Sequence, residues 1–170
     1  MDRRYKAYRP AVYGLMTALA MVLSYLESLL PPIGIPGAKI GLPNIVTVVG
    51  LYTVGYKASG AISILRIILT GLTFGNPSMM IYSFFGWTVS MAVMLITKKT
   101  GLFSPVGVSV AGGIAHNIGQ LICASLVMES TAVFAYFPVL LPAGVTAGAL
   151  IGIAGGILAE RSKKYFMPEE

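Results

Sequence analysis

One arginine lies in the middle of an otherwise apolar stretch of the sequence. Arg66 falls within the run 58–74, and an ionised side chain at the centre of a bilayer costs about 3 kcal/mol or more, so it needs a partner or a task. The alternating spacing of four and three places it on one helical face with Ser59, Ser63, Thr70 and Thr73. This face is expected to point towards protein or a wet cavity.

Two interpretations of Arg66 stay open from the residues alone. The guanidinium could pair with Glu27, the acidic residue inside the first apolar run, since a long side chain can bridge a modest difference in depth. It could instead bind an anionic ligand, because its planar fork suits a carboxylate or a phosphate. Arg66 and Thr70 are therefore candidate ligand-binding residues, with Glu27 as a possible ion-pair partner.

A second polar group lies in the run 103–128. His116 and Gln120 are one helical turn apart, with Asn117 next to them. Such residues often make hydrogen bonds between helices, but three adjoining polar groups favour the lining of a cavity. The other candidate binding residues are expected towards the outer side of the membrane. They are Lys39, Asn44, Asn76 and Tyr82. Tyr82 also suits the aromatic belt at a membrane surface.

Several kinds of chemistry lack the residues they require. The sequence has no GxxxxGK[ST] phosphate loop, and Asp2 is its one aspartate, so neither this route of ATP hydrolysis nor a Ser-His-Asp triad is expected. Cys123 is the single cysteine, which excludes an intramolecular disulfide. No catalytic residue, no metal site and no required cofactor is predicted. Basic residues occur in short groups between apolar runs, which argues against nucleic acid as a partner.

The elements that must position these groups are membrane helices. Of 170 residues, 56% are hydrophobic and 11% charged, and the mean hydropathy is +0.81. This composition is too apolar to cover a water-exposed domain. Apolar runs near 11–30, 42–56, 58–74, 79–96, 103–128 and 133–159 predict an all-α integral membrane protein with six spans in a single domain, 1–170.

Charge distribution predicts the orientation of these spans. If 42–56 and 58–74 are separate helices, ten of the twelve basic residues fall on the side of the N-terminus. The positive-inside rule then places both ends in the cytoplasm, as a basic tail over 1–10 and a second tail over 160–170. The first outer loop, 31–41, is rich in Pro and Gly and is expected to fold back as a cap.

Small residues recur at four-residue spacing in three of the runs. Gly144, Gly148, Gly152 and Gly156 form one stripe, Gly107, Ala111, Ala115 and Gly119 a second, and Gly14 with Ala18 a shorter third. Such stripes let helix backbones approach closely, either within the chain or against another membrane subunit.

Several separated motifs carry a resemblance to a known family. They are PGAKIGLPNIVT (36–47), LRIILTG (65–71), FGN (74–76), SPVGVSVAG (104–112) and HNIGQ (116–120). Together they resemble the Gx transporter family, which is also labelled heptaprenyl diphosphate synthase component I. That family is similar to the substrate-binding S components of energy-coupling-factor transporters, which are six-helix proteins of the bacterial cytoplasmic membrane.

The resemblance implies a function and its partners. The expected role is capture of an anionic or amphiphilic vitamin-like molecule from outside, together with a membrane scaffold subunit and ATPase subunits. Gly14 and Ala18 would then be the docking face for the scaffold. Two alternatives stay open: a non-transporting partner in extracellular electron transfer, with a flavin or quinone as ligand, and an accessory subunit of a prenyl diphosphate synthase.

Overall fold

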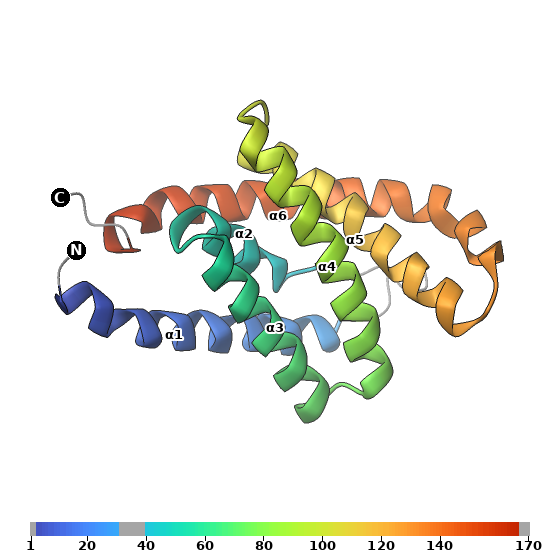
Figure 1. Cartoon of the computed structure of the whole chain (residues 1–170), viewed down its shortest axis with the longest axis horizontal. Coiled ribbons are helices and arrows are strands. Elements are labelled where there is room, and N and C mark those ends of the chain that lie inside the picture. The colour runs from blue at the N-terminus through green and yellow to red at the C-terminus, as the bar shows by residue number, and fades with distance from the viewer. Residues whose placement is uncertain (1–2, 31–39, 167–170) are drawn as a thin grey trace.

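The computed structural model describes residues 3–30 and 40–166, and side chains from Tyr8 to Leu30 and from Ile40 to Lys163. Within these residues the fold is helical throughout, with no strand. The elements are α1 (Arg3–Ser28), α2 (Asn44–Thr53), α3 (Tyr56–Thr73), α4 (Pro77–Thr100), α5 (Pro105–Val127), the 3-10 helix η1 (Thr131–Tyr136) and α6 (Phe137–Phe166). The start of α1 and the end of α6 lie at the same end of the molecule (Figure 1).

Four segments are long and apolar enough to cross a membrane. They are Tyr8–Ser28, Pro77–Thr100, Pro105–Val127 and Thr131–Lys163. Large apolar side chains cover their outer surfaces, among them Leu15, Ile96 and Leu150, each more than 60% exposed. Lipid is the solvent that such a surface requires. The structure thus agrees with an all-α integral membrane protein.

The second helix is shorter than the sequence predicts. The apolar run 42–56 is expected to span the membrane, but α2 has ten residues and is therefore about 15 Å long, half of a ~30 Å hydrocarbon core. It packs against α1, α3 and α6, and most of its residues are buried. Backbone at membrane depth that does not cross the bilayer is tolerated where protein surrounds it.

Other helix boundaries differ from the expected ones by fewer residues. Helix α1 begins at Arg3, so most of the expected tail 1–10 continues the first helix. Helix α6 runs to Phe166, which extends it through most of the expected tail 160–170. Basic residues in both segments kept these ends out of the predicted spans, but they do not prevent a helix from continuing beyond the lipid.

Local signals in the sequence explain the ends of α4 and α5. Asn76 caps α4, where its side-chain Oδ1 accepts a hydrogen bond of 2.8 Å from the backbone N–H of Met79. Ser104 caps α5 in the same way, and a proline follows each cap at the first helical position. Gly101 ends α4 with φ of 70°, a conformation that a glycine adopts without strain.

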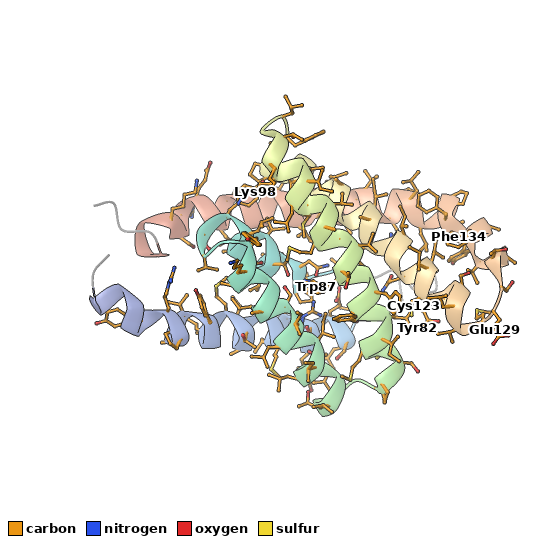
Figure 2. The ribbon with its side chains drawn as sticks, in the orientation of Figure 1. Tyr82, Trp87, Lys98, Cys123, Glu129 and Phe134 are labelled. Carbon is orange, nitrogen blue, oxygen red and sulfur yellow. The ribbon has the colours of Figure 1, made fainter. Side chains whose placement is uncertain are left out.

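Lysine at the end of α4 holds the end of the short helix α2. The Nζ of Lys98 donates a hydrogen bond to the carbonyl of Leu51 and lies 4.4 Å from the centre of the Tyr52 ring. A cation is favourable at the carboxyl end of a helix, where the last carbonyls lack partners within the helix. Lys98 and Trp87, which both belong to α4, are labelled in Figure 2. Helix α2 is thus attached to the bundle at its carboxyl end.

The glycine stripe of α6 packs against α5 inside the chain. A Cβ atom on Gly148 would lie 2.7 Å from the Cα of Val110, and one on Gly152 would lie 2.7 Å from the Cα of Val106. Contacts this short require glycine. On α5 the facing residues are Val106, Val110 and Gly113, so the predicted stripe Gly107, Ala111, Ala115 and Gly119 is not the face that contacts α6.

The short stripe of α1 has a different environment. A Cβ on Gly14 would meet no atom within 4 Å, and Ala18 is exposed on the same helix. Their neighbours Leu15 and Leu19 are 69% and 51% exposed. This face of α1 is therefore available to lipid or to another protein.

Candidate ligand-binding cavity

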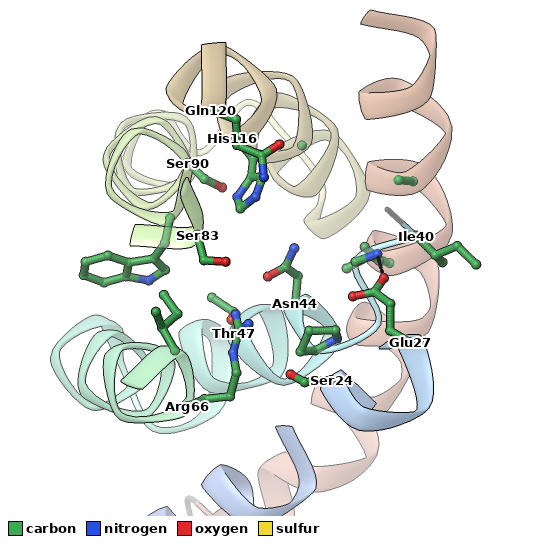
Figure 3. A pocket seen from close by; sticks show the side chains of 18 of the residues that line it. Ser24, Glu27, Ile40, Asn44, Thr47, Arg66, Ser83, Ser90, His116 and Gln120 are labelled. Carbon is green, nitrogen blue, oxygen red and sulfur yellow. Dashed lines mark hydrogen bonds between the residues drawn. The ribbon is translucent and has the colours of Figure 1, made fainter. Parts of the chain in front are cut away.

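A cavity of about 520 Å³ lies among the helices (Figure 3). All six α-helices contribute to its wall. Its volume is within the range of about 300–1,000 Å³ that is usual for small-molecule sites. The lining is mostly apolar with a limited set of polar groups, which is the composition of a site that binds and orients one small molecule.

The structure brings six of the nine predicted binding residues to this cavity. Asn44 of α2, Arg66 and Thr70 of α3, and His116, Asn117 and Gln120 of α5 all line it, and so does Glu27 of α1. These residues come from four helices and are separated by up to about half of the sequence. The face predicted for α3 therefore points inward at Ser59, Ser63, Arg66 and Thr70, whereas Thr73 at the end of the helix is exposed.

Arg66 is the most unusual group in the cavity wall. Its side chain is 9% exposed and extends from α3 towards the cavity (Figure 3). Among the described residues, none gives the guanidinium a hydrogen bond or an ion pair within 4 Å, although Glu27 is near enough to interact with it electrostatically. A buried charge without a partner is costly, and its desolvation is compensated when an ion of opposite charge binds.

Glu27 makes a different contact from the one the ion-pair hypothesis requires. Its Oε1 accepts hydrogen bonds from the backbone N–H groups of Gly41 and Leu42, the second at 3.2 Å. No ion pair within 4 Å joins Glu27 to Arg66. The carboxylate instead ties the end of α1 to the residues that lead into α2, on one side of the cavity (Figure 3).

Glu27→Ala is expected to release this attachment. The two backbone N–H groups would lose their acceptor, at a cost of about 1–3 kcal/mol. Hydrogen exchange of Gly41 and Leu42 should then accelerate by about tenfold or more, since 1.4 kcal/mol corresponds to a factor of ten. Glu27→Gln retains an acceptor oxygen and is the control that should keep most of the protection. Equal exchange in Glu27→Ala and the native chain would show that these bonds do not hold the segment.

The polar residues of α5 both connect neighbouring helices and line the cavity. Asn117 is 9% exposed, and its Nδ2 donates a hydrogen bond of 2.9 Å to the carbonyl of Leu140 in α6. The ring of His116 packs against α4 at Gly86, where a Cβ would lie 2.7 Å from its Cε1. Asn117 thus uses its donor between helices, while His116 and Gln120 lie at the cavity surface.

Two predicted binding residues lie elsewhere, and a third is not described. Asn76 does not line the cavity, and its Oδ1 is used to cap α4. Tyr82 is partly exposed on α4 and is also absent from the lining. Lys39, like most of the expected cap 31–41, falls outside the described residues. Asn76 directly precedes Pro77, and an asparagine before a proline at the first helical position is a signal for a helix cap. This capping role replaces the binding role that was expected from its position in an outer turn.

Other polar lining residues were not among the predicted set. They are Ser24, Ser28, Thr47, Ser83, Trp87, Ser90 and Ser109. Thr47 and Ser63 share a hydrogen bond of 2.9 Å between α2 and α3. Thr47 follows Asn44 by three residues and so shares its helical face, which is a signal that the sequence does contain. Single serines in apolar helices carry no comparable signal.

No group of three or more His, Cys, Asp or Glu side chains able to hold a metal ion occurs in the described part of the chain. The cavity wall instead offers hydrogen-bond donors, hydroxyl groups and apolar surface. Those groups suit an organic molecule.

The fold and the cavity define a class: a helical membrane protein with an internal cavity. The chain belongs to the family described as heptaprenyl diphosphate synthase component I, which is also the Gx transporter family; the match covers residues 16–158. No curated protein and no solved structure matches the chain. The family membership agrees with the resemblance found in the sequence motifs.

Proposed function

We propose that this protein captures an anionic or amphiphilic small molecule in its internal cavity, as the substrate-binding subunit of an uptake transporter of the energy-coupling-factor type. One observation carries the proposal: the buried Arg66 lines a cavity of about 520 Å³, and among the described residues its guanidinium makes no hydrogen bond and no ion pair within 4 Å, with Glu27 acting on it only at longer range. A polar group that costs stability and makes no internal bond is retained for a ligand.

The proposal includes a place in the cell. Both termini would lie in the cytoplasm of a bacterial cell, as the charge distribution indicates. This orientation requires six passages through the membrane, and the second would be made by the segment that contains the short, buried helix α2. The Glu27 side of the cavity would then face outward, and the ligand would arrive from outside. The sequence lacks a GxxxxGK[ST] loop, so energy for uptake would come from separate ATPase subunits.

Mass spectrometry of the purified protein tests the proposal. A molecule that fits the cavity should remain bound through purification in mild detergent and should be released on unfolding. It should carry a negative charge at neutral pH. A flavin or a quinone in the released fraction would favour the electron-transfer alternative. A protein that retains no molecule, and whose gene deletion changes the uptake of none, would contradict the proposed function.

The open face of α1 supports docking to a membrane scaffold subunit. Gly14→Leu should block close approach of a second helix and reduce copurification of the scaffold and ATPase subunits by about tenfold or more. The fold should tolerate the change, since nothing lies within 4 Å of a Cβ at this position. Ala61→Leu, at an exposed alanine of α3, is the matched control and should leave copurification unchanged. Unchanged assembly of Gly14→Leu would remove this face from the interface.

A second candidate function comes from the family description, which names a component of heptaprenyl diphosphate synthase. In this role the chain would be a non-catalytic membrane accessory to a prenyl-transferring enzyme. It would copurify with that enzyme from native membranes, without ATPase subunits. The identity of the copurifying protein separates the two candidates.

A further inference from the structure

The short helix α2 runs alongside α6 and in the same direction. A Cβ on Gly41, just before α2, would lie 3.0 Å from the Cδ1 of Ile151 in α6. A Cβ on Gly155, one turn further along α6, would lie 2.8 Å from the Cγ1 of Val48 in α2. Because the residue numbers increase together along both helices, their carboxyl ends point to the same side of the bundle.

Two lysines lie at this side, near the end of α2. The Nζ of Lys98 in α4 donates a hydrogen bond to the carbonyl of Leu51 and lies 4.4 Å from the centre of the Tyr52 ring. Lys163 lies in α6, two turns beyond Gly155, and its side chain is exposed. Long side chains of a helix point back towards its amino end, so Lys163 extends towards the level at which α2 ends. The two lysines are near enough to repel each other electrostatically.

Capping of α2 accounts for only one of these lysines. Lys98 already bonds to a carbonyl at the carboxyl end of the helix, where a cation is favourable. A second positive charge close to the first raises the energy of both, whereas an anion between them would be attracted by each. Glu160, one turn before Lys163, is exposed, and among the described side chains it forms no ion pair within 4 Å with either lysine.

The position of the two lysines along the helices indicates which anion is available to them. The apolar segments Pro77–Thr100 and Thr131–Lys163 are both long enough to cross a membrane, and both end at this level. Lysines at the ends of membrane helices extend their amino groups to the lipid head groups. Tyr52 and the exposed Tyr56 lie at the same end of the bundle, as in the aromatic belt of a membrane surface. Phospholipid phosphates are the anions found at this depth.

From this arrangement we infer that the junction of α2, α4 and α6 binds the phosphate head group of an anionic phospholipid, with Lys98 and Lys163 as its two cations. Basic clusters between membrane helices recognise such head groups by charge. A zwitterionic lipid is attracted less, because its own ammonium group offsets the phosphate. The bound lipid adds a contact at the carboxyl end of α2, a helix that also lines the cavity. The inference concerns a different site from the cavity and does not depend on the cavity's ligand.

Thermal unfolding in lipid nanodiscs tests the inference. Discs that contain phosphatidylglycerol mixed with phosphatidylcholine should give a melting temperature about 4 °C or more above that in phosphatidylcholine alone, since each lysine contributes to the attraction. Inorganic phosphate added to the phosphatidylcholine discs should not reproduce this shift, which separates a lipid from a free anion. Native mass spectrometry after mild detergent extraction should show phosphatidylglycerol retained on the protein.

Neutral variants of two lysines show whether the effect belongs to this junction. Lys163→Gln should remove at least half of the shift caused by phosphatidylglycerol and reduce retention of that lipid by about fivefold. Lys99→Gln is the matched control: it removes the same charge from the end of α4, at an exposed residue next to Lys98, and should leave the shift nearly unchanged. Lys163→Arg should also retain it. Unfolding of each variant in phosphatidylcholine discs gives its own stability for comparison.

Three results would overturn the inference. The first is an equal melting temperature in the two kinds of disc. The second is an equal loss in Lys99→Gln and Lys163→Gln, since this would show diffuse attraction of lipid to the whole basic surface. The third is a full shift with inorganic phosphate, which would assign the junction to a free anion. None of these results changes which molecule copurifies in the cavity, so the proposed function is tested separately.

Discussion

Arg66→Met is expected to abolish ligand binding and, at the same time, to stabilise the ligand-free protein. Removing one member of a buried charge pair weakens binding by about 2–5 kcal/mol, so the affinity should fall by about 30-fold or more. In the ligand-free state Arg66 is 9% exposed, and among the described residues its guanidinium makes no hydrogen bond and no ion pair within 4 Å. Replacing it by an apolar side chain of similar length removes a desolvated charge.

The two effects of this substitution have opposite signs, and that makes the result diagnostic. A residue that holds the fold together would lower stability when removed, whereas a residue kept for binding costs stability. We expect a gain of about 1–3 kcal/mol in the unfolding free energy without ligand. Thermal unfolding in detergent and calorimetry with the copurified ligand measure the two quantities separately.

Arg66→Lys is the control for charge without the planar fork. A lysine keeps the positive charge but cannot make two parallel hydrogen bonds to a carboxylate, so binding should weaken by about tenfold and persist. If Arg66→Met destabilised the protein by more than about 2 kcal/mol and left affinity unchanged, Arg66 would be a structural residue. The proposed function would then lose the observation that carries it.

The sequence was sufficient to predict those cavity residues whose placement in a membrane helix costs free energy. Arg66 and the polar group 116–120 stand out because polar side chains in apolar runs are expensive, and helical spacing places them on one face. All of these residues line the cavity in the structure. Local helix signals were also present, in the Asn76-Pro77 and Ser104-Pro105 pairs that begin α4 and α5.

Two features could not be predicted from the sequence because they depend on packing. The length of α2 is set by its surroundings: it is covered by α1, α3 and α6, and its apolar residues read equally well as a span. The roles of the small residues are set by helix rotation. Gly14 and Gly148 have the same kind of motif, but one faces open space and the other faces the backbone of α5.

The contacts that the polar side chains make could not be predicted from the sequence either. Glu27 was expected as a possible partner for Arg66; its carboxylate does interact with Arg66 electrostatically, but its hydrogen bonds are to the backbone N–H groups of Gly41 and Leu42. Trp87 was visible in the fourth apolar run, but an unpartnered indole N–H becomes apparent only when the neighbouring side chains have been placed. Such groups are recognised by the absence of a contact, and a sequence does not contain that information.

Gly148→Leu is expected to be among the most destabilising single changes in the helix bundle. A Cβ at this position would lie 2.7 Å from the Cα of Val110 and 2.8 Å from the carbonyl oxygen of Ser109. Both atoms belong to the backbone of α5 and cannot move without displacing the helix. Separation of α5 and α6 would also weaken the neighbouring contact at Gly152, so we expect a loss of about 3 kcal/mol or more, or no folded protein.

Membrane yield and thermal unfolding in detergent measure this effect, and Gly14→Leu is its control. The two substitutions add the same side chain to the same kind of stripe, but Gly14 has no neighbour within 4 Å. The isolated chain should therefore fold normally with Gly14→Leu and fail with Gly148→Leu, while Gly148→Ala should give an intermediate loss. Equal stability of the two leucine variants would show that α5 and α6 do not pack through their glycines. If they differ as expected, the effects of Gly14→Leu in cells can be attributed to a missing partner, because its fold is intact.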